Sequence, residues 1–284
     1  MIKKYLTLTK PGIIFGNVIT AAAGFALASK GHFDFWLFCA MLIGLSLIIA
    51  SACVFNNYMD RDIDSVMART KNRPLVQGSI STNNAIVFGI VLGALGSTVL
   101  FMYTNLLTLF SALIGFIVYV FVYGIAKRRS VYATLIGSIA GGMPPVVGYC
   151  AVSNNFDLGT FIIFMIIVLW QMPHFYAIAM YRLTDYQAAS IPVLPAQNGI
   201  QATKIEMFLY VIAFTVTTFM LTLFGYTGYM YLAVAAMVGL AWIKLSYNGF
   251  TAENDTLWAQ KMFRFSLVAV MALCIMILID PLRN

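Results

Sequence analysis

WLFCAMLIGLSLIIASACVF (residues 36–55) runs directly into NNYMDRDIDSVMARTKNRPLVQG (residues 56–78), and these two stretches set the plan of the chain. The first has no charged side chain, and as a helix it is long enough to cross a bilayer core of roughly 30 Å. The second concentrates acidic and basic side chains. We therefore expect a membrane-spanning helix that ends in a polar segment able to carry chemistry.

The composition of the whole chain is that of a polytopic membrane protein. Of its 284 residues, 61% are hydrophobic and only 10% are charged, with a mean hydropathy of +0.88, which excludes an ordinary soluble domain. We predict a single all-α domain over residues 1–284, a membrane helical bundle with about nine transmembrane helices. The predicted spans are 12–29, 36–55, 85–103, 106–126, 131–152, 158–181, 207–224, 226–243 and 265–279.

The basic residues sort to one side of this arrangement. With nine spans, 15 of the 17 lysines and arginines fall on one face, and only Lys30 and Arg283 fall on the other. By the positive-inside rule, the N-terminus faces the cytoplasm and the C-terminus lies on the far side of a bacterial inner membrane. The net charge of +7 therefore indicates orientation more than nucleic-acid binding. We interpret the first span as retained and not as a signal peptide.

The acidic residues of the second stretch have helical spacing. If the helix continues to residue 64, Asp60 and Asp64 share one face with Asn57, and Asp62 lies on the opposite side. Like charges four residues apart destabilise a helix, so this pair requires a cation, and we expect that the chain does not supply one. A divalent metal that carries a phosphate fits this requirement.

Two basic groups accompany these carboxylates. Arg69, Lys71 and Arg73 follow closely and suit a diphosphate bridged to carboxylates by Mg2+, with solvated loop charge as the alternative. Lys127 and Arg128, in the segment YGIAKRRS, are candidate diphosphate ligands or a topology anchor.

A second polar segment, WQMPHFYAIAMYRLTDYQAASIPVLP (residues 170–195), returns to the same side after four crossings. On a helix, His174, Tyr181 and Asp185 form one stripe, so two polar stripes can face each other across one cavity. Pro173 should kink this span and free a carbonyl group. His174 is then either a structural residue bonded to that carbonyl or a substrate-binding residue.

Small residues and cysteines inside the spans are structural. Glycine-rich runs such as GNVITAAAGFALAS and GSIAGG permit close helix packing. The four cysteines, in the order Cys39, Cys53, Cys150 and Cys274, have no paired spacing and are interpreted as inert buried thiols.

Several motifs together resemble the UbiA superfamily of intramembrane prenyltransferases, in the branch that prenylates heme. The residues that carry the resemblance are NNYMDRDIDSVMARTKNRPLVQG, YGIAKRRS, GGMPPVVGY (residues 141–149), WQMPHF and TDYQAASIPVLP, which occur in the order of that family. The resemblance implies nine helices around a central cavity that opens to the cytoplasmic side, with a lateral route for lipid-like substrates.

The resemblance also implies an activity and its residues. The farnesyl group of farnesyl diphosphate would be joined to a vinyl group of heme b, with Mg2+ as cofactor, in the lipid bilayer and with downstream heme-handling or oxidase proteins as possible partners. Asp60, Asp64, Asp185 and Tyr181 would be catalytic, and Asn57 would join the three aspartates as a metal ligand. His174, which stands with Tyr181 where many relatives have aspartates, would ligate the heme iron or contact a propionate. Ala133 departs from the family pattern, in which asparagine is expected.

Two other functions compete with this one. A UbiA-type enzyme that prenylates an aromatic quinone precursor would use the same diphosphate site. A transporter of an anionic metabolite would also place charges in a bundle, but transporters carry them at broken helices near the midplane, whereas the charges here lie at helix ends.

Overall fold

The computed structural model describes residues 2–282, and over this range the chain is a bundle of helices. Nine segments in the described range are long and apolar enough to cross a membrane, which confirms the predicted number. They are α2 (Pro11–Ser29), α3 (Phe35–Met59), α5 (Thr82–Tyr103), the segment Leu106–Ala126, α8 (Ala133–Ser153), α9 (Leu158–Tyr181), α12 (Gly199–Leu223), the segment Tyr229–Thr251 and α14 (Asp255–Ile279). The segment Leu106–Ala126 is built from α6 (Leu106–Ile117), the π-helix η1 (Val118–Tyr123) and α7 (Gly124–Ala126), and Tyr229–Thr251 from α13 (Tyr229–Tyr247) and the 3-10 helix η2 (Asn248–Thr251).

The predicted boundaries are close except where charge lies inside a helix. The span predicted at 207–224 begins at Gly199, and the one predicted at 265–279 begins at Asp255. Both extensions carry basic residues, Lys204 in α12 and Lys261 in α14. A search for uncharged runs stops at such residues, whereas the backbone hydrogen-bond ladder continues past them.

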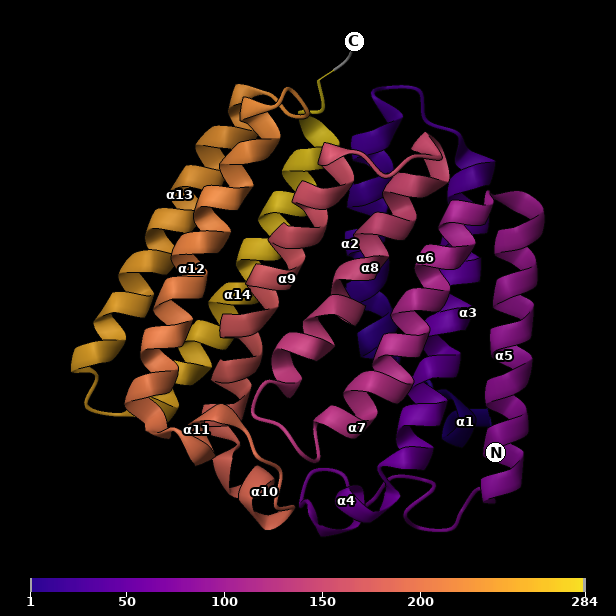
Figure 1. Cartoon of the computed structure of the whole chain (residues 1–284), viewed down its shortest axis with the longest axis vertical. Coiled ribbons are helices and arrows are strands. Elements are labelled where there is room, and N and C mark those ends of the chain that lie inside the picture. Colours follow the sequence, from indigo (N-terminus) through magenta and orange to yellow (C-terminus); the bar gives the residue numbers. More distant parts are fainter. Residues whose placement is uncertain (1, 283–284) are drawn as a thin grey trace.

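Four short helices gather at one end of the bundle (Figure 1). They are α1 (Ile2–Leu8), α4 (Arg61–Val66), α10 (Leu183–Ala188) and α11 (Leu194–Gln197). We call this end, with α1, α4, α10 and α11, the basic end, because the segments that carry most of the lysines and arginines meet there. Lys30 follows α2 at the opposite end, where the C-terminal side of the chain also lies (Figure 1). Arg283 lies outside the described residues.

The helices pack closely where glycine removes a side chain. A Cβ atom at Gly24 in α2 would overlap the carbonyl oxygen of Pro145 in α8, and one at Gly148 would overlap that of Ala21. The prediction of close packing through small residues is thus confirmed for this helix pair. All four cysteines are free, and Cys53, Cys150 and Cys274 are buried.

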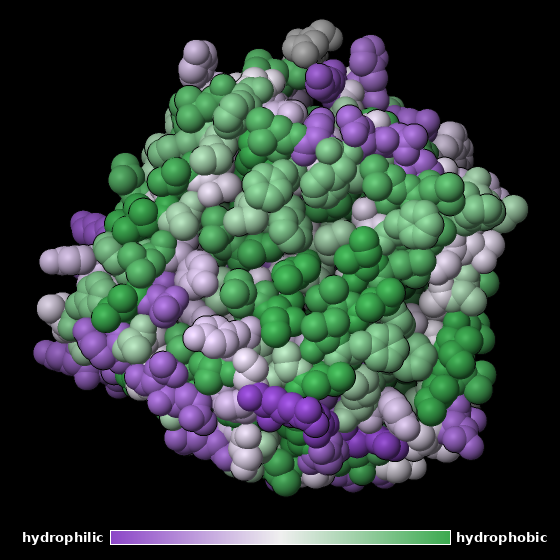
Figure 2. Space-filling model, viewed as in Figure 1, coloured by the Kyte–Doolittle hydropathy of each residue, from purple (hydrophilic) through white to green (hydrophobic). Residues whose placement is uncertain are grey.

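The main apolar core lies among α9, α12, α13 and α14, where Tyr231, Trp242 and Phe214 are fully buried. Large apolar side chains also cover the outside, including Ile90, Leu95 and Phe101 of α5. Figure 2 shows this hydrophobic belt, with hydrophilic residues gathered toward the two ends of the molecule. An apolar circumference between polar ends is the surface that a bilayer requires.

Candidate active site

Asp60 and Asp64 lie at the junction between α3 and α4. Asp60 breaks the helix with φ −92° and ψ 6°, yet its N–H still donates to Asn56 O (3.0 Å), and the N–H of Asp64 donates to Asp60 O (2.7 Å). The helical spacing is therefore kept, and Asp60 and Asp64 are both buried, whereas Asp62 is exposed. The predicted shared face is confirmed.

The chain itself supplies a cation to each buried carboxylate, so our expectation that it would not is wrong. Lys127 Nζ donates to Asp60 Oδ2, and Arg73 Nη1 lies 2.5 Å from Asp64 Oδ2. Lys127 directly follows α7 and is 67 residues from Asp60 in the sequence. Helical spacing relates only residues that are near each other in the sequence, so it could not predict the Lys127–Asp60 pair. Both ion pairs lie at the basic end, Asp60 directly before α4 and Asp64 within it.

Arg128 forms a third ionic contact, with the exposed Asp62. Its guanidinium donates from Nη1 to Asp62 Oδ2 (2.5 Å) and from Nη2 to Asp62 Oδ1 (2.7 Å), and Nη2 lies 3.8 Å from Asp60 Oδ1. The hydrogen bond from Arg128 lowers the pKa of Asp62 to about 2. Burial lowers the pKa of Lys127, against the opposing effect of Asp60. Four cations, counting Lys10, thus surround three carboxylates, which leaves positive charge for an anionic ligand.

Two buried oxygens beside these pairs have no hydrogen-bond partner. They are Asn57 Oδ1 and Asp60 Oδ1, although the amide nitrogen of Asn57 is satisfied by Leu8 O at 2.8 Å. Unpaired buried acceptors are costly, and carboxylate and amide oxygens are the ligands that Mg2+ takes from proteins. The residues present therefore fit a Mg2+ ion held by one or two carboxylates.

Asp185, the fourth predicted metal ligand, does not join this group closely. Over residues 2–282, no set of three His, Cys, Asp or Glu side chains is close enough to hold a metal ion. Asp185 lies half-buried in α10. Its role as a ligand stays a prediction.

Lys10 is a site residue that the sequence reasoning missed. It takes a left-handed conformation (φ 51°, ψ 68°) directly before Pro11, and its Nζ donates to Asn56 Oδ1 at 2.6 Å. Burial lowers its pKa to about 8, and among its charged neighbours Asp60 and Asp64 raise the pKa. Lys30, Asn154 and Ser190 also have positive φ, so the hydrogen bond and the charged neighbours of Lys10, and not its backbone conformation, place it in the site. The one feature of the sequence that could have indicated Lys10 as a site residue is its position immediately before Pro11, the first residue of the first span.

The remaining predicted basic residues lie farther out. Arg69 and Lys71 are exposed in the connection between α4 and α5, whereas Arg73 is half-buried. Arg69 still acts across to the second polar segment, because its charge lowers the pKa of Tyr186 in α10, which burial raises. The two segments are therefore electrostatic neighbours.

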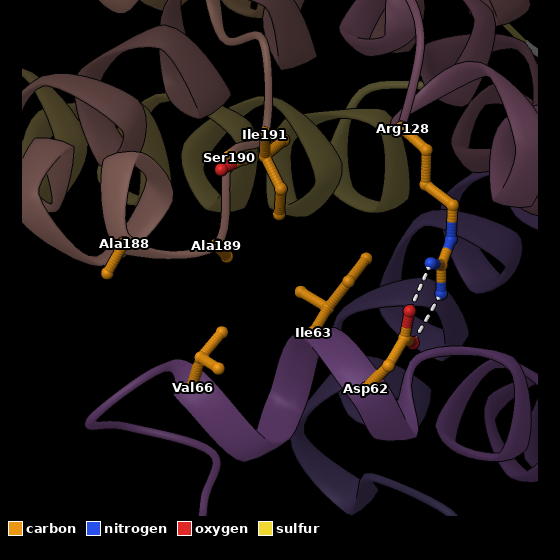
Figure 3. A pocket seen from close by; sticks show the side chains of 8 residues that line it. All are labelled: Asp62, Ile63, Val66, Arg128, Ala188, Ala189, Ser190 and Ile191. Carbon is orange, nitrogen blue, oxygen red and sulfur yellow. Dashed lines mark hydrogen bonds and ion pairs between the residues drawn. The ribbon is translucent and has the colours of Figure 1, made fainter.

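A pocket of about 380 Å3 separates α4 from the chain that follows α10 (Figure 3). Val66 and Ile63 point across it toward Ala189 and Ile191, with the Asp62–Arg128 pair at one edge (Figure 3). The two polar segments thus border one pocket, but none of the residues of the two predicted stripes lines it. That the two stripes face each other across a cavity stays a prediction.

His174 and Tyr181 lie on α9, which continues without interruption through Pro173. His174 is buried and its Nδ1 lies 2.7 Å from Ser266 Oγ, in α14. The predicted partner, a carbonyl freed by Pro173, is thus replaced by a hydroxyl from another helix. Tyr181, half-buried, packs edge-on against Phe263 (5.8 Å between ring centroids) and carries Arg182 over its ring.

The fold and site define a class of membrane enzyme. The family model described as the UbiA prenyltransferase family matches residues 17–268, and the chain belongs to this family. The resemblance found in the sequence motifs is thereby confirmed.

Two relatives that are similar over nearly the whole chain carry the same name. The chain is 56% identical to a protoheme IX farnesyltransferase of Protochlamydia amoebophila (strain UWE25), over 99% of each chain. It is 54% identical to a protoheme IX farnesyltransferase of Yersinia pseudotuberculosis serotype O:1b (strain IP 31758), over 99% of this chain and 95% of the relative.

Solved structures share the fold at low sequence identity. A digeranylgeranylglyceryl phosphate synthase has a TM-score of 0.83 at 18% identity and covers 100% of this chain and 99% of its own. A UbiA homologue from Archaeoglobus fulgidus, bound to GPP and Mg2+, has a TM-score of 0.66 at 16% identity, covering 97% and 99%. These likenesses establish the fold of the bundle.

Proposed function

We propose that this protein transfers the farnesyl group of farnesyl diphosphate to a vinyl group of heme b. The observation that carries the proposal is the buried pair Asp60 and Asp64 with its surrounding cations, beside two buried oxygens, Asp60 Oδ1 and Asn57 Oδ1, that have no hydrogen-bond partner. Relatives at 54% and 56% identity over nearly the whole chain are named protoheme IX farnesyltransferases. The heme acceptor is carried over from those relatives.

The site residues have different roles in breaking the allylic carbon–oxygen bond. Asn57, Asp60 and Asp64 would hold Mg2+, and Asp185 would join them as a ligand if the segment that carries it moves closer when substrate binds. The ion, when bound, neutralises charge on the departing diphosphate. Lys10, Arg73 and Lys127 stabilise the same charge electrostatically, and Arg128, Arg69 and Lys71 complete the basic surface around it. Because these groups lie at the basic end, the diphosphate stays near water and the farnesyl chain enters the apolar interior.

The rest of the reaction needs no covalent bond to the enzyme. As the diphosphate leaves, the vinyl group supplies the electron pair that forms the new bond to the allylic carbon. The cation left on the former vinyl group is captured by water, which loses a proton and becomes the hydroxyl group. Apolar and aromatic surroundings keep water away until the carbon–carbon bond has formed, and we assign Tyr181, half-buried at the end of α9, to these surroundings.

The deciding experiment incubates the purified protein in detergent with heme b, farnesyl diphosphate and Mg2+ and measures the mass of the heme. We expect a farnesylated, hydroxylated heme, and no such product without Mg2+. Prenylation of an aromatic quinone precursor, with unchanged heme, would favour the other UbiA-type activity. Flux of an anionic metabolite into sealed vesicles without a prenyl donor would favour a transporter.

A further inference from the structure

A second cavity, of about 20 Å3, lies inside the bundle among α2, α8, α9, α13 and α14. Its wall is largely apolar and includes Ala23, Pro145, Ile163 and Val270. A cavity of this size has room for a group about as large as a methyl group or a water molecule, and a cavity lined by apolar side chains does not hold water. The occupant that this lining fits is therefore a hydrocarbon group.

The side of α2 that borders this cavity is open nearer the basic end. Gly12, Gly16 and Thr20 follow one another at four-residue intervals, so they lie on one side of the helix. Thr20 lines the cavity, whereas a Cβ atom at Gly12 or Gly16 would meet no atom within 4 Å. A narrow hydrocarbon chain can therefore lie along α2, from Gly12 to the cavity, without displacing a side chain.

The path along α2 begins at the carboxylate site. Lys10 directly precedes α2, and its Nζ donates to Asn56 Oδ1, one helical turn before Asp60. From Pro11 to Thr20 the helix rises by about 14 Å, which is comparable to the length of an extended farnesyl chain. A farnesyl diphosphate whose diphosphate binds at the carboxylate site therefore has its terminal isoprene unit at the cavity.

Tyr231 lines the cavity from the end of the bundle opposite the carboxylate site, where α13 begins (Figure 1). Its side chain is fully buried, and its hydroxyl has no hydrogen-bond partner within residues 2–282. Burying an unpartnered hydroxyl group costs free energy. Packing alone would therefore favour phenylalanine at this position, and Tyr231 is a candidate for a role in substrate binding.

The backbone of Tyr231 is held in place by the end of α14. Its N–H donates to Asp280 Oδ2 at 2.8 Å, and the N–H of Gly228 donates to Asp280 O at 3.0 Å. Asp280 directly follows α14, which also lines the cavity. Moving the Tyr231 ring away from the cavity by shifting α13 would break these hydrogen bonds, so the ring forms a fixed wall.

We infer that this cavity receives the terminal isoprene unit of the prenyl donor, and that Tyr231 closes it and sets the maximum length of the chain. The inference rests on the proposed function in that the donor is a prenyl diphosphate bound at the carboxylate site. A farnesyl chain ends at the cavity. A geranylgeranyl chain has one further isoprene unit, which the ring of Tyr231 excludes, so the enzyme selects its donor by length.

The test compares the affinities of the full-length protein in detergent for farnesyl diphosphate and geranylgeranyl diphosphate, measured by isothermal titration calorimetry with Mg2+ and without heme. Wild type should bind farnesyl diphosphate more tightly. Tyr231→Ala removes the wall and should shift the ratio of the two affinities toward geranylgeranyl diphosphate by about tenfold or more. Tyr231→Phe, which keeps the ring, should retain the wild-type ratio. Tyr229→Ala, on the same helix with a side chain that is 84% exposed, is the matched control and should also retain it.

A second variant tests the cavity from another helix. Cys274 lines it from α14, so Cys274→Leu should fill it and weaken the binding of farnesyl diphosphate relative to geranyl diphosphate, which is one isoprene unit shorter. This variant decides the question if Tyr231→Ala does not fold.

The outcomes separate the selection of chain length from the overall activity. An unchanged affinity ratio in Tyr231→Ala or in Cys274→Leu, or an equal change in Tyr229→Ala, would overturn the inference even if farnesyl transfer to heme proceeds. Heme of unchanged mass after incubation with wild type, farnesyl diphosphate and Mg2+ would instead overturn the proposed function, because the affinities are measured without heme.

Discussion

At Asp60 and Asp64, each buried carboxylate is paired with a cation at Oδ2. Asp60 Oδ2 pairs with Lys127 and Asp64 Oδ2 with Arg73, whereas Asp60 Oδ1 has no hydrogen-bond partner and only the guanidinium of Arg128 at 3.8 Å. Asp60 Oδ1 is therefore the carboxylate oxygen of this pair that is free to accept a further hydrogen bond or a metal ion.

Asp60→Ala and Asp64→Ala should each lower the rate of heme farnesylation by about a hundredfold or more, because the charge of the leaving group is then uncompensated by bound metal. The rate is measured by mass analysis of heme at saturating substrates. Heme binding should stay near the wild-type level. Glu253→Gln, an exposed acidic residue, serves as the control. Wild-type rates in either alanine variant would argue against a metal role.

The titration of Lys10 should make the binding of farnesyl diphosphate depend on pH. Because burial lowers the pKa of Lys10 to about 8, its amino group is positively charged below that pH and loses the charge as the pH rises above it. The charged form binds a diphosphate, so KM for farnesyl diphosphate should increase between pH 7 and pH 9. Lys10→Arg, which stays charged, should flatten this part of the profile. An unchanged profile in that variant would assign the titration to another group.

At the scale of the element, α2 and α8 depend on the absence of side chains between them. The backbones approach so closely at Gly24 and Gly148 that a methyl group would collide with a carbonyl oxygen of the other helix. Backbone cannot move aside as a flexible side chain can. The contact therefore fixes the position of α2, and with it the placement of Lys10 beside Asn56.

Gly148→Ala should destabilise the protein by about 1–3 kcal/mol through overpacking. The measurement is thermal unfolding in detergent, followed by circular dichroism. Gly16→Ala is the matched control, because a Cβ atom at Gly16 on the same helix pair meets nothing within 4 Å. Equal melting temperatures for the two variants would show that α2 and α8 can separate freely.

Across the whole molecule, the alternation of helices sends the connections with polar motifs to one end. The connections that contain α4, and α10 with α11, lie there together with α1 (Figure 1). The connection after α2, with Lys30, lies at the other end. In a cell membrane this asymmetry of basic residues should place the basic end in the cytoplasm.

Cysteine labelling checks that orientation. Lys71→Cys, exposed at the basic end, should react with a membrane-impermeant maleimide only in inverted vesicles. Lys30→Cys should react in right-side-out membranes. A cysteine-free background is needed, since Cys39 is half-buried and not fully shielded. Labelling of Lys71→Cys from the outside would reverse the topology.

Much of this architecture was open to reasoning from local pattern. The nine spans, the asymmetry of basic residues and the shared face of Asp60 and Asp64 were all predicted, because apolar length and helical periodicity are properties of neighbours in sequence. The starts of α12 and α14 were not, because charged residues in the N-terminal part of each helix, such as Lys204 and Lys261, interrupt the apolar run. The family motifs supplied the acceptor and the chemistry, which periodicity alone does not contain.

Only the tertiary structure decided which side chains meet. Asp60 is paired with Lys127, Lys10 with Asn56, and His174 with Ser266, and each pair joins residues more than 40 positions apart. Such contacts depend on the rotation and depth at which packed helices settle, and small residues such as Gly24 and Gly148 set these across the interface. Spacing within one helix says which residues share a face, but it cannot say what lies opposite that face.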